Sequence, residues 1–159
     1  MGGNLGDVKR TLQTAQQLVN ARVGAVLRCS HRYESDAWGF TSAQRFSNQA
    51  LEITTDLTPH EVLDAVQCIE ADLGRNRAAE ALEKAATGAA YVSRPIDIDI
   101  IFYDDAVIAD ARLTIPHPRL AEREFALVPL NEIMRTRRHP VTGETVGEML
   151  AALRQKEEA

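Results

Sequence analysis

The sequence predicts one α+β domain spanning residues 1–159, with helices packed on one face of an antiparallel β-sheet. Helical and strand-like hydrophobic patterns follow one another in the order helix, strand, strand, helix, strand, and a hairpin and further helices come after them. Hydrophobic residues make up 45% of the chain, which is enough for one core at this length.

The first four elements are indicated by hydrophobic periodicity and capping residues. Apolar residues at helical spacing predict a helix over about 7–21. Residues 24–34 alternate and predict a strand, and residues 46–57 predict a second one. A capping box at 58–61, with proline at the first helical position, begins another helix, which Gly74 ends.

The second half of the chain begins with a long loop, expected over 75–94. Residues 94–105 predict a buried strand, and residues 107–115 are expected to pair back on it after a turn. Residues 116–133 suggest two short helical pieces, and a capping box at 145–148 opens a terminal helix. This order resembles a ferredoxin-like βαββαβ sandwich that lacks its first strand.

The strand RPIDIDIIFYDD carries two carboxylates inside its most hydrophobic run. Side chains alternate along a strand, so Asp97 and Asp99 share one face, with Cα atoms roughly 6.5–7 Å apart. Carboxylates this close repel each other, and one gains a proton unless a cation such as Mg²⁺ lies between them. An antiparallel strand with one solvated face gives the same alternation, and spacing alone favours that reading.

Basic side chains surround this strand. Guanidinium groups bind phosphate oxygens bidentately, so together with the acid pair they suggest Mg²⁺-dependent phosphoryl chemistry, although each one alone is more often a surface residue. His117 lies between two prolines, which give its imidazole a fixed direction. The arginines are Arg75, Arg77 and Arg94 before or at the strand, and Arg112, Arg119 and Arg123 after it.

An aromatic side chain and an amide share one face of the second strand. Phe46 and Asn48 are two residues apart, an arrangement that can stack on and read a flat heterocycle. Ordinary core packing is the alternative for each aromatic residue taken separately.

Composition argues against several classes of protein. The net charge of −5 does not favour non-specific nucleic-acid binding. Cys29 and Cys68 are far apart and form no CxxC motif, which suggests free thiols in a cytoplasmic protein. No apolar run reaches membrane-spanning length, and residues 1–10 lack the apolar core of a signal peptide, so we expect no membrane partner.

Six motifs together resemble those of the 6-hydroxymethyl-7,8-dihydropterin pyrophosphokinases of folate biosynthesis. They are GGNLGD, RYES, FSNQALEITT, IEADLGR, RPIDIDIIFYDD and RLTIPHPRLAEREFALVPLNEI, in the family's order over residues 2–133. The resemblance implies a ferredoxin-like sandwich and an ATP-binding transferase, a 2-amino-4-hydroxy-6-hydroxymethyldihydropteridine diphosphokinase. Such an enzyme transfers pyrophosphate from ATP to the pterin hydroxymethyl group, releases AMP and uses two Mg²⁺ ions.

The resemblance also assigns residues. Asp97 and Asp99 match the Mg²⁺ ligands and, with Arg77 and Arg94, the catalytic set. The ATP-binding positions are Gln67, Glu70, Arg75, Arg77, Arg94, Arg112, Leu113, Thr114, His117 and Arg123. The pterin-binding positions are Ser35, Trp38, Phe46, Asn48, Tyr91, Asp97 and Phe125.

The chain departs from the family around its mobile loop and at its start. Val92-Ser93 replaces Gly-Pro, Tyr91 stands where a tryptophan closes over the pterin, and the 75–94 loop is longer. In the family a central hydrophobic strand precedes GGNLGD, and here Met1 stands where it should end. We therefore expect translation to begin upstream or the sequence to be truncated, and a protein beginning at Met1 to be unstable.

Two other functions fit the same residues. A ferredoxin-like binding or regulatory domain would hold a nucleotide without turnover. A nucleotidyl transferase would release pyrophosphate instead of AMP. The expected working state is a monomer that binds ATP and the hydroxymethyl dihydropterin.

Overall fold

The structure is a computed structural model, and it describes residues 1–35, 46–88 and 95–158. Within these ranges it has the helices and short antiparallel strands of an α+β protein. Predictions that concern residues 36–45 and 89–94 lie outside the described part. None of the described helices is both long enough and apolar enough to cross a membrane.

The first two helices confirm the sequence prediction. Helix α1 (Val8–Arg22) begins at Asp7, whose side chain accepts a hydrogen bond from the Arg10 backbone N–H. Helix α2 (Pro59–Asp72) begins at the predicted capping box. It ends before Gly74, whose φ of +99° suits a residue without a Cβ atom.

The two predicted strands are each divided in two. Residues 24–34 form β2 (Ala25–Cys29) and β3 (Tyr33–Ser35), and residues 46–57 form β4 (Phe46–Asn48) and β5 (Leu51–Thr54). Strands β2 and β5 pair antiparallel, and β4 pairs with β3. The division falls where Ser30 bonds the Ala50 backbone through its N–H and its hydroxyl, so a side chain replaces part of the ladder.

A two-residue strand, β1 (Gly2–Gly3), directly follows the position where the family's first strand should end. It pairs antiparallel with β4, and Gly2 also bridges Asp97 on its other side. The Asp97 backbone N–H donates to the Gly2 carbonyl (2.6 Å), and the Asp97 backbone carbonyl accepts from the Gly2 N–H (2.8 Å). The start of the chain thus fixes the backbone at Asp97, within residues 95–105, which are called the acidic segment below.

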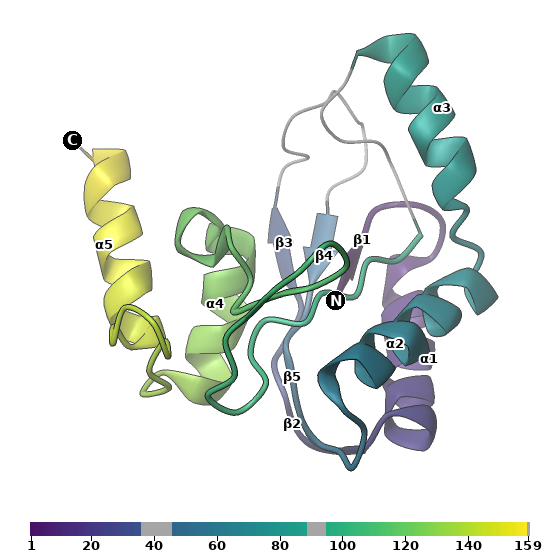
Figure 1. The fold of residues 1–159 in the computed structure, drawn as a ribbon. Helices are drawn as coiled ribbons and strands as arrows, with labels where there is room; N and C mark the ends of the chain where they lie inside the picture. The colour runs from purple at the N-terminus through teal and green to yellow at the C-terminus, as the bar shows by residue number, and fades with distance from the viewer. Residues whose placement is uncertain (36–45, 89–94, 159) are drawn as a thin grey trace.

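Helices cover both faces of the strands, and the prediction of helices on one face is wrong. Figure 1 shows α1 and α2 on one side, with α4 (Glu124–Met134) and α5 (Val146–Glu158) on the other. One core cluster joins α1 and α2 to β2 and β5, through Val19, Val62, Val66 and Ile69.

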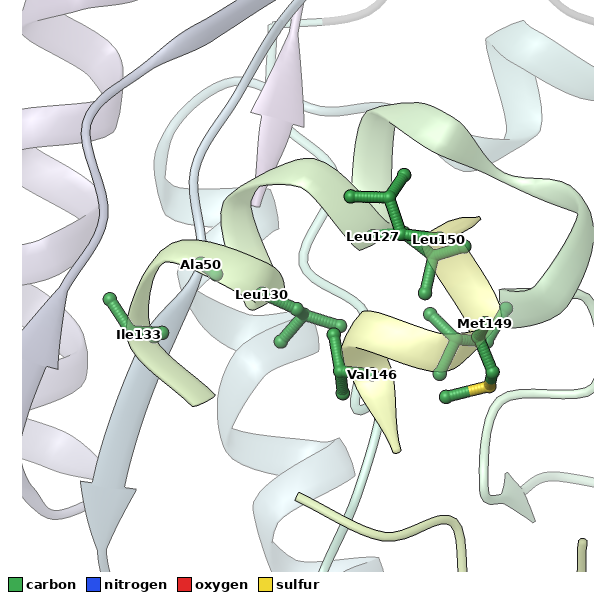
Figure 2. Close-up of a cluster of buried hydrophobic side chains, with 8 residues drawn as sticks. Ala50, Leu127, Leu130, Ile133, Val146, Met149 and Leu150 are labelled. Atoms are coloured by element: carbon green, nitrogen blue, oxygen red, sulfur yellow. The ribbon is translucent and has the colours of Figure 1, made fainter. Parts of the chain in front are cut away.

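The second cluster lies between α4 and α5, as Figure 2 shows. Leu127 and Leu130 of α4 meet Val146, Met149 and Leu150 of α5. Helix α5 begins where predicted, because the Thr145 hydroxyl accepts from the Glu148 N–H. A 3-10 turn, η1 (Leu120–Glu122), precedes α4, which confirms the prediction of two helical pieces.

The predicted buried strand at 94–105 is only partly correct. Apart from Asp99, which is exposed, its residues from Ile96 to Tyr103 are buried or half-buried. The bridge to Gly2 is nevertheless their one β-pairing in the described chain. Ile98 and Ile100 pack on the α1–α2 cluster, whereas Ile101 and Phe102 pack on the α4–α5 cluster. Apolar contacts on both sides explain the continuous hydrophobic run.

Two further predictions are wrong. Residues 107–115 do not pair back on the acidic segment but form their own hairpin, β6 (Ile108–Ala109) with β7 (Thr114–Ile115). The hairpin is tied to α2 instead, because His60 Nε2 lies 2.7 Å from Asp110 Oδ2.

The predicted loop over 75–94 contains a helix, α3 (Arg77–Thr87). Asn76 caps its start, and Gly88, with φ +71°, ends it in the left-handed conformation. Alanine has the highest helix propensity, so this alanine-rich stretch needs little packing to be helical.

The α+β class is confirmed, whereas a continuous ferredoxin-like sheet is not present. The described strands form three separate small sheets. The acidic segment pairs with β1 only at the Gly2–Asp97 bridge, and β5 pairs only with β2 among the described strands.

Candidate active site

The two predicted carboxylates lie together and face different cationic partners. Asp97 Oδ1 accepts a hydrogen bond from Arg75 Nη1 at 2.8 Å. Asp99 Oδ2 lies 3.8 Å from Arg123 Nη1 and 3.9 Å from His117 Nε2. The structure therefore brings together residues that the sequence separates by up to 48 positions (75 to 123).

The surroundings of Asp99 disfavour its charged form. Burial raises the pKa of Asp99, and the charge of Asp97 raises this pKa further, while His117 and Arg123 lower it less. No group of three or more acidic, histidine or cysteine side chains in the described residues could hold a metal by itself. Two carboxylates completed by phosphate oxygens and water suit Mg²⁺, so this donor set fits that ion.

Arg75 connects the acid pair to two glutamates. Its side chain is 5% exposed and binds Glu70 Oε2 through Nη1 (2.8 Å). Glu80 receives two parallel hydrogen bonds, from Nε (2.9 Å) and Nη2 (3.1 Å). Burial acts to lower the pKa of Arg75, but Glu80, Asp97 and Glu70 outweigh it and raise this pKa. The guanidinium is therefore always charged.

Glu70 holds the acidic segment against α2. Its carboxylate is 1% exposed and accepts from the Ile98 backbone N–H (2.8 Å) and from Arg77 Nη2 (2.7 Å), besides Arg75. The residue predicted to bind ATP is thus a buried anchor in this structure.

We expect Glu70→Ala to lower the free energy of unfolding by about 3 kcal/mol, because the change removes one partner of a buried ion pair and leaves the Ile98 N–H unpaired. Urea denaturation at pH 7 measures it. Glu83→Ala, an exposed position on α3, is the control and should change stability by less than about 0.5 kcal/mol. A Glu70 variant as stable as that control would contradict the anchoring role.

His117 presents a defined nitrogen to Asp99. Its Nδ1 accepts from the Arg119 backbone N–H (3.3 Å), so in the neutral ring the proton lies on Nε2, facing the carboxylate. Burial lowers the pKa of His117, although the charge of Asp99 acts in the opposite direction. The imidazole is therefore a neutral hydrogen-bond donor at pH 7.

A groove of about 700 Å³ extends from this site between β5 and the acidic segment. Asn48, Phe125, Asp97 and Asp99 line it. Among the residues that the structure describes, the buried Asn48 Nδ2 atom has no hydrogen-bond partner, which suits a donor to a bound polar molecule. The Arg123 guanidinium lies over the Phe125 ring, 5.5 Å from its centroid.

The other residues predicted for the pterin site fall into two groups, those on strands β3 and β4 and those outside the described residues. Phe46 and Asn48 lie on one strand, β4, as predicted, and Ser35 pairs with Phe46 in the neighbouring β3. Trp38, Tyr91 and the predicted phosphate-binding Arg94 lie outside the described residues.

The remaining predicted ATP-binding residues lie on helix α2 and on the β6–β7 hairpin. Arg112 pairs with Asp64 of α2 (2.6 Å), Leu113 is buried, and Thr114 is exposed on β7. Gln67 lies half-buried on α2, one turn before Glu70. The described contacts therefore place the hairpin residues against α2.

Sequence reasoning missed Glu80. A loop was expected where α3 begins, so no contact between its first turn and Arg75 could be foreseen. The signal was present, because Asn76, the alanines and Gly88 are a helix with both of its caps.

Comparison with known proteins agrees with this geometry. Residues 1–135 match the family model "7,8-dihydro-6-hydroxymethylpterin-pyrophosphokinase (HPPK)". The chain is similar to proteins named 2-amino-4-hydroxy-6-hydroxymethyldihydropteridine pyrophosphokinase. The one from Methylorubrum extorquens is 39% identical over 96% of this chain and 90% of its own length. Those from Bacillus subtilis (98% and 89%) and Porphyromonas gingivalis (84% and 86%) are each 34% identical. The chain belongs to the 7,8-dihydro-6-hydroxymethylpterin-pyrophosphokinase family.

Proposed function

We propose that this protein transfers pyrophosphate from ATP to the hydroxymethyl group of 6-hydroxymethyl-7,8-dihydropterin and releases AMP, a step of folate biosynthesis. The observation that supports this proposal most directly is the acid pair Asp97 and Asp99. The pair lies between Arg75 on one side and His117 and Arg123 on the other. The family match and the names of the relatives support the same reaction.

The proposed cofactor is Mg²⁺, two ions, which Asp97 and Asp99 would hold. Bound there, the ions would neutralise negative charge on the polyphosphate and would lower the pKa of the attacking hydroxyl. Arg123 and His117 donate toward charge that develops on phosphate oxygens beside Asp99. Asp97 or nearby water takes the proton of the pterin hydroxyl.

The proposed pterin site uses the face of β4 and the groove end. Phe46 and Phe125 offer rings for stacking, and the unpaired Asn48 Nδ2 donates to a polar edge of the heterocycle. The Asn48 amide lies close to β1, because a Cβ atom built on Gly2 would be only 2.2 Å from Asn48 Oδ1. Only glycine at position 2 leaves this space.

The test is a product assay with purified protein, ATP and Mg²⁺. AMP formed only when the hydroxymethyl pterin is present supports the proposal. Pyrophosphate as the product would indicate a nucleotidyl transferase, and tight nucleotide binding without any product would indicate a binding domain. Either result would overturn the proposed reaction.

Arg94→Ala and Arg77→Ala are expected to differ. Arg94 adjoins the acidic segment, so its loss should mainly weaken ATP binding. Arg77 begins α3 and pairs with Glu70, and its loss should mainly lower kcat, because contacts from a moving segment tighten near the transition state. Steady-state kinetics with both substrates varied separates the two effects. Equal changes in ATP affinity would count against a catalytic role for this segment.

A cytoplasmic location and a monomeric working state remain predictions. Size-exclusion chromatography with light scattering tests the second of these directly.

A further inference from the structure

Some of the predicted ATP-binding residues come from two separate elements, helix α2 and the β6–β7 hairpin. Gln67 lies on α2, whereas Arg112, Leu113 and Thr114 lie at the tip of the hairpin. One nucleotide can contact both elements only if the distance between them suits it. Contacts that hold this distance before binding raise affinity, because they reduce the ordering that binding requires.

Asp110 organises the tip of the hairpin. Its Oδ1 atom accepts hydrogen bonds from the backbone N–H groups of Arg112 and Leu113, both at 2.9 Å. The Asp110 backbone N–H donates to the Leu113 carbonyl at 3.0 Å. An aspartate that bonds the backbone two residues ahead stabilises a turn. The shape of the tip is therefore held by local bonds that do not involve α2.

Two charged contacts join this tip to α2. Asp110 Oδ2 lies 2.7 Å from His60 Nε2, and Arg112 Nη2 donates to Asp64 Oδ1 at 2.6 Å. His60 and Asp64 are four residues apart, so they lie on the same face of α2, one turn from each other. The tip is thus attached to the helix at two neighbouring points.

The base of the hairpin is attached elsewhere. The His117 N–H donates to the Ile101 carbonyl at 3.0 Å, which fixes the end of the hairpin on the acidic segment. The contacts with α2 therefore decide where the tip lies. One of them uses Arg112, which a nucleotide would itself engage. The other joins His60 to Asp110, neither of which is a predicted ligand, so this contact can persist when a nucleotide is bound.

We propose that His60 is a positioning residue for ATP, which acts through Asp110: its contact holds the tip of the β6–β7 hairpin at the distance from α2 at which both elements reach one nucleotide. This inference rests on the proposed function, because it requires ATP as a substrate and the hairpin tip as part of its site. It adds a residue outside the predicted site that sets the affinity for ATP and takes no part in the transfer.

The first test is steady-state kinetics with ATP and the hydroxymethyl pterin varied separately. His60→Ala removes the contact with Asp110 and leaves the capping box of Thr58 and Glu61 intact, so α2 should form as in wild type. The variant should raise KM for ATP about two- to fivefold, an effect limited by the 43% and 44% exposure of the two side chains. The kcat and the KM for the pterin should not change, since only binding shared by the ground state and the transition state is lost.

A conservative variant and direct binding separate positioning from stability. His60→Gln should restore the wild-type KM for ATP, because the glutamine amide can donate to Asp110 from a similar place. Isothermal titration with a non-hydrolysable ATP analogue should show the same change in Kd as in KM for His60→Ala. The matched control is His31→Ala, which removes an equally short contact, 2.6 Å, with Glu132 of α4 and should leave this Kd unchanged.

The outcomes distinguish this inference from the proposed function. Wild-type protein that forms no AMP would overturn the proposed function itself. If AMP is formed but Arg112→Ala binds the analogue as tightly as wild type, the hairpin tip is not part of the ATP site and the inference falls. If Arg112→Ala weakens binding but His60→Ala does not, or if His60→Gln fails to restore it, the positioning role is overturned. A His60→Ala variant that loses kcat and both substrate affinities together with Tm would assign His60 a purely structural role.

Discussion

Asp99→Asn is expected to lower kcat by about a thousandfold or more while the protein remains as stable as wild type, or becomes more stable, at pH 7. The loss of activity follows from the proposed function, in which Asp99 is one of two carboxylates that would hold the cation, and the cation would neutralise charge on the transferring group. The unchanged stability follows from the raised pKa of Asp99. A raised carboxyl pKa means that ionisation opposes folding once the pH exceeds the ordinary carboxyl value, and asparagine carries no such cost.

A steady-state assay measures kcat, and thermal unfolding of the ligand-free protein measures stability. Asp105→Asn serves as the control, since this side chain is 91% exposed in the same segment and should change neither quantity. Asp97→Asn is less suited to the test, because it also removes a partner of the buried Arg75. A clear loss of stability in Asp99→Asn would assign this carboxylate a structural role.

The second large effect is expected at the start of the chain. The Met1 N-terminus donates to the Gln49 carbonyl (2.7 Å), and its own carbonyl accepts from the Gln49 N–H (2.8 Å). Burial lowers the pKa of the terminal amine. The negative charges of the nearby Asp99 and Asp97 raise this pKa, but by less than burial lowers it. Met1 lines the groove between β5 and the acidic segment.

This groove has the features of a strand position. Ile53 of β5 and Ile98 and Ile100 of the acidic segment are among its lining residues, and β5 pairs only with β2 among the described strands. Each buried backbone group left unpaired costs about 1–3 kcal/mol. An extended apolar segment there would hydrogen-bond to both edges.

We therefore expect an N-terminal extension, Val-Ile-Val-Ala-Val before Met1, to raise the free energy of unfolding by about 3 kcal/mol and Tm by about 6–12 °C. Two extensions of equal length are the controls. Gly-Ser-Gly-Ser-Gly supplies no apolar surface, and Val-Ile-Pro-Ala-Val lacks a central backbone donor. If all three extensions melt at the same temperature as the protein beginning at Met1, the groove does not receive a strand.

Local interactions made much of the fold predictable. Helices α1, α2 and α5 were predicted because each has an apolar stripe and a side chain that caps its own backbone within four residues. The paired positions of Asp97 and Asp99 were likewise predictable, since side-chain alternation depends only on an extended backbone.

The failures have two different sources, a local signal that was overlooked and interactions between distant residues. Helix α3 was overlooked because the motif arginines at its start suggested a loop, although its caps were visible. The hairpin at Ile108–Ile115 docks on α2 through His60 and Asp110, fifty positions apart, and no local pattern indicates such a partner.

The sequence by itself determined the α+β class, the family and the identity of the acidic pair, because these depend on residue type and short-range spacing. Only the tertiary structure decided that helices cover both faces of the strands and that Glu70, Arg75 and Glu80 form one ion-pair network behind Asp97. The physical reason is that a buried charge takes whichever opposite charge the packing brings within a few ångströms, and that choice depends on the whole fold.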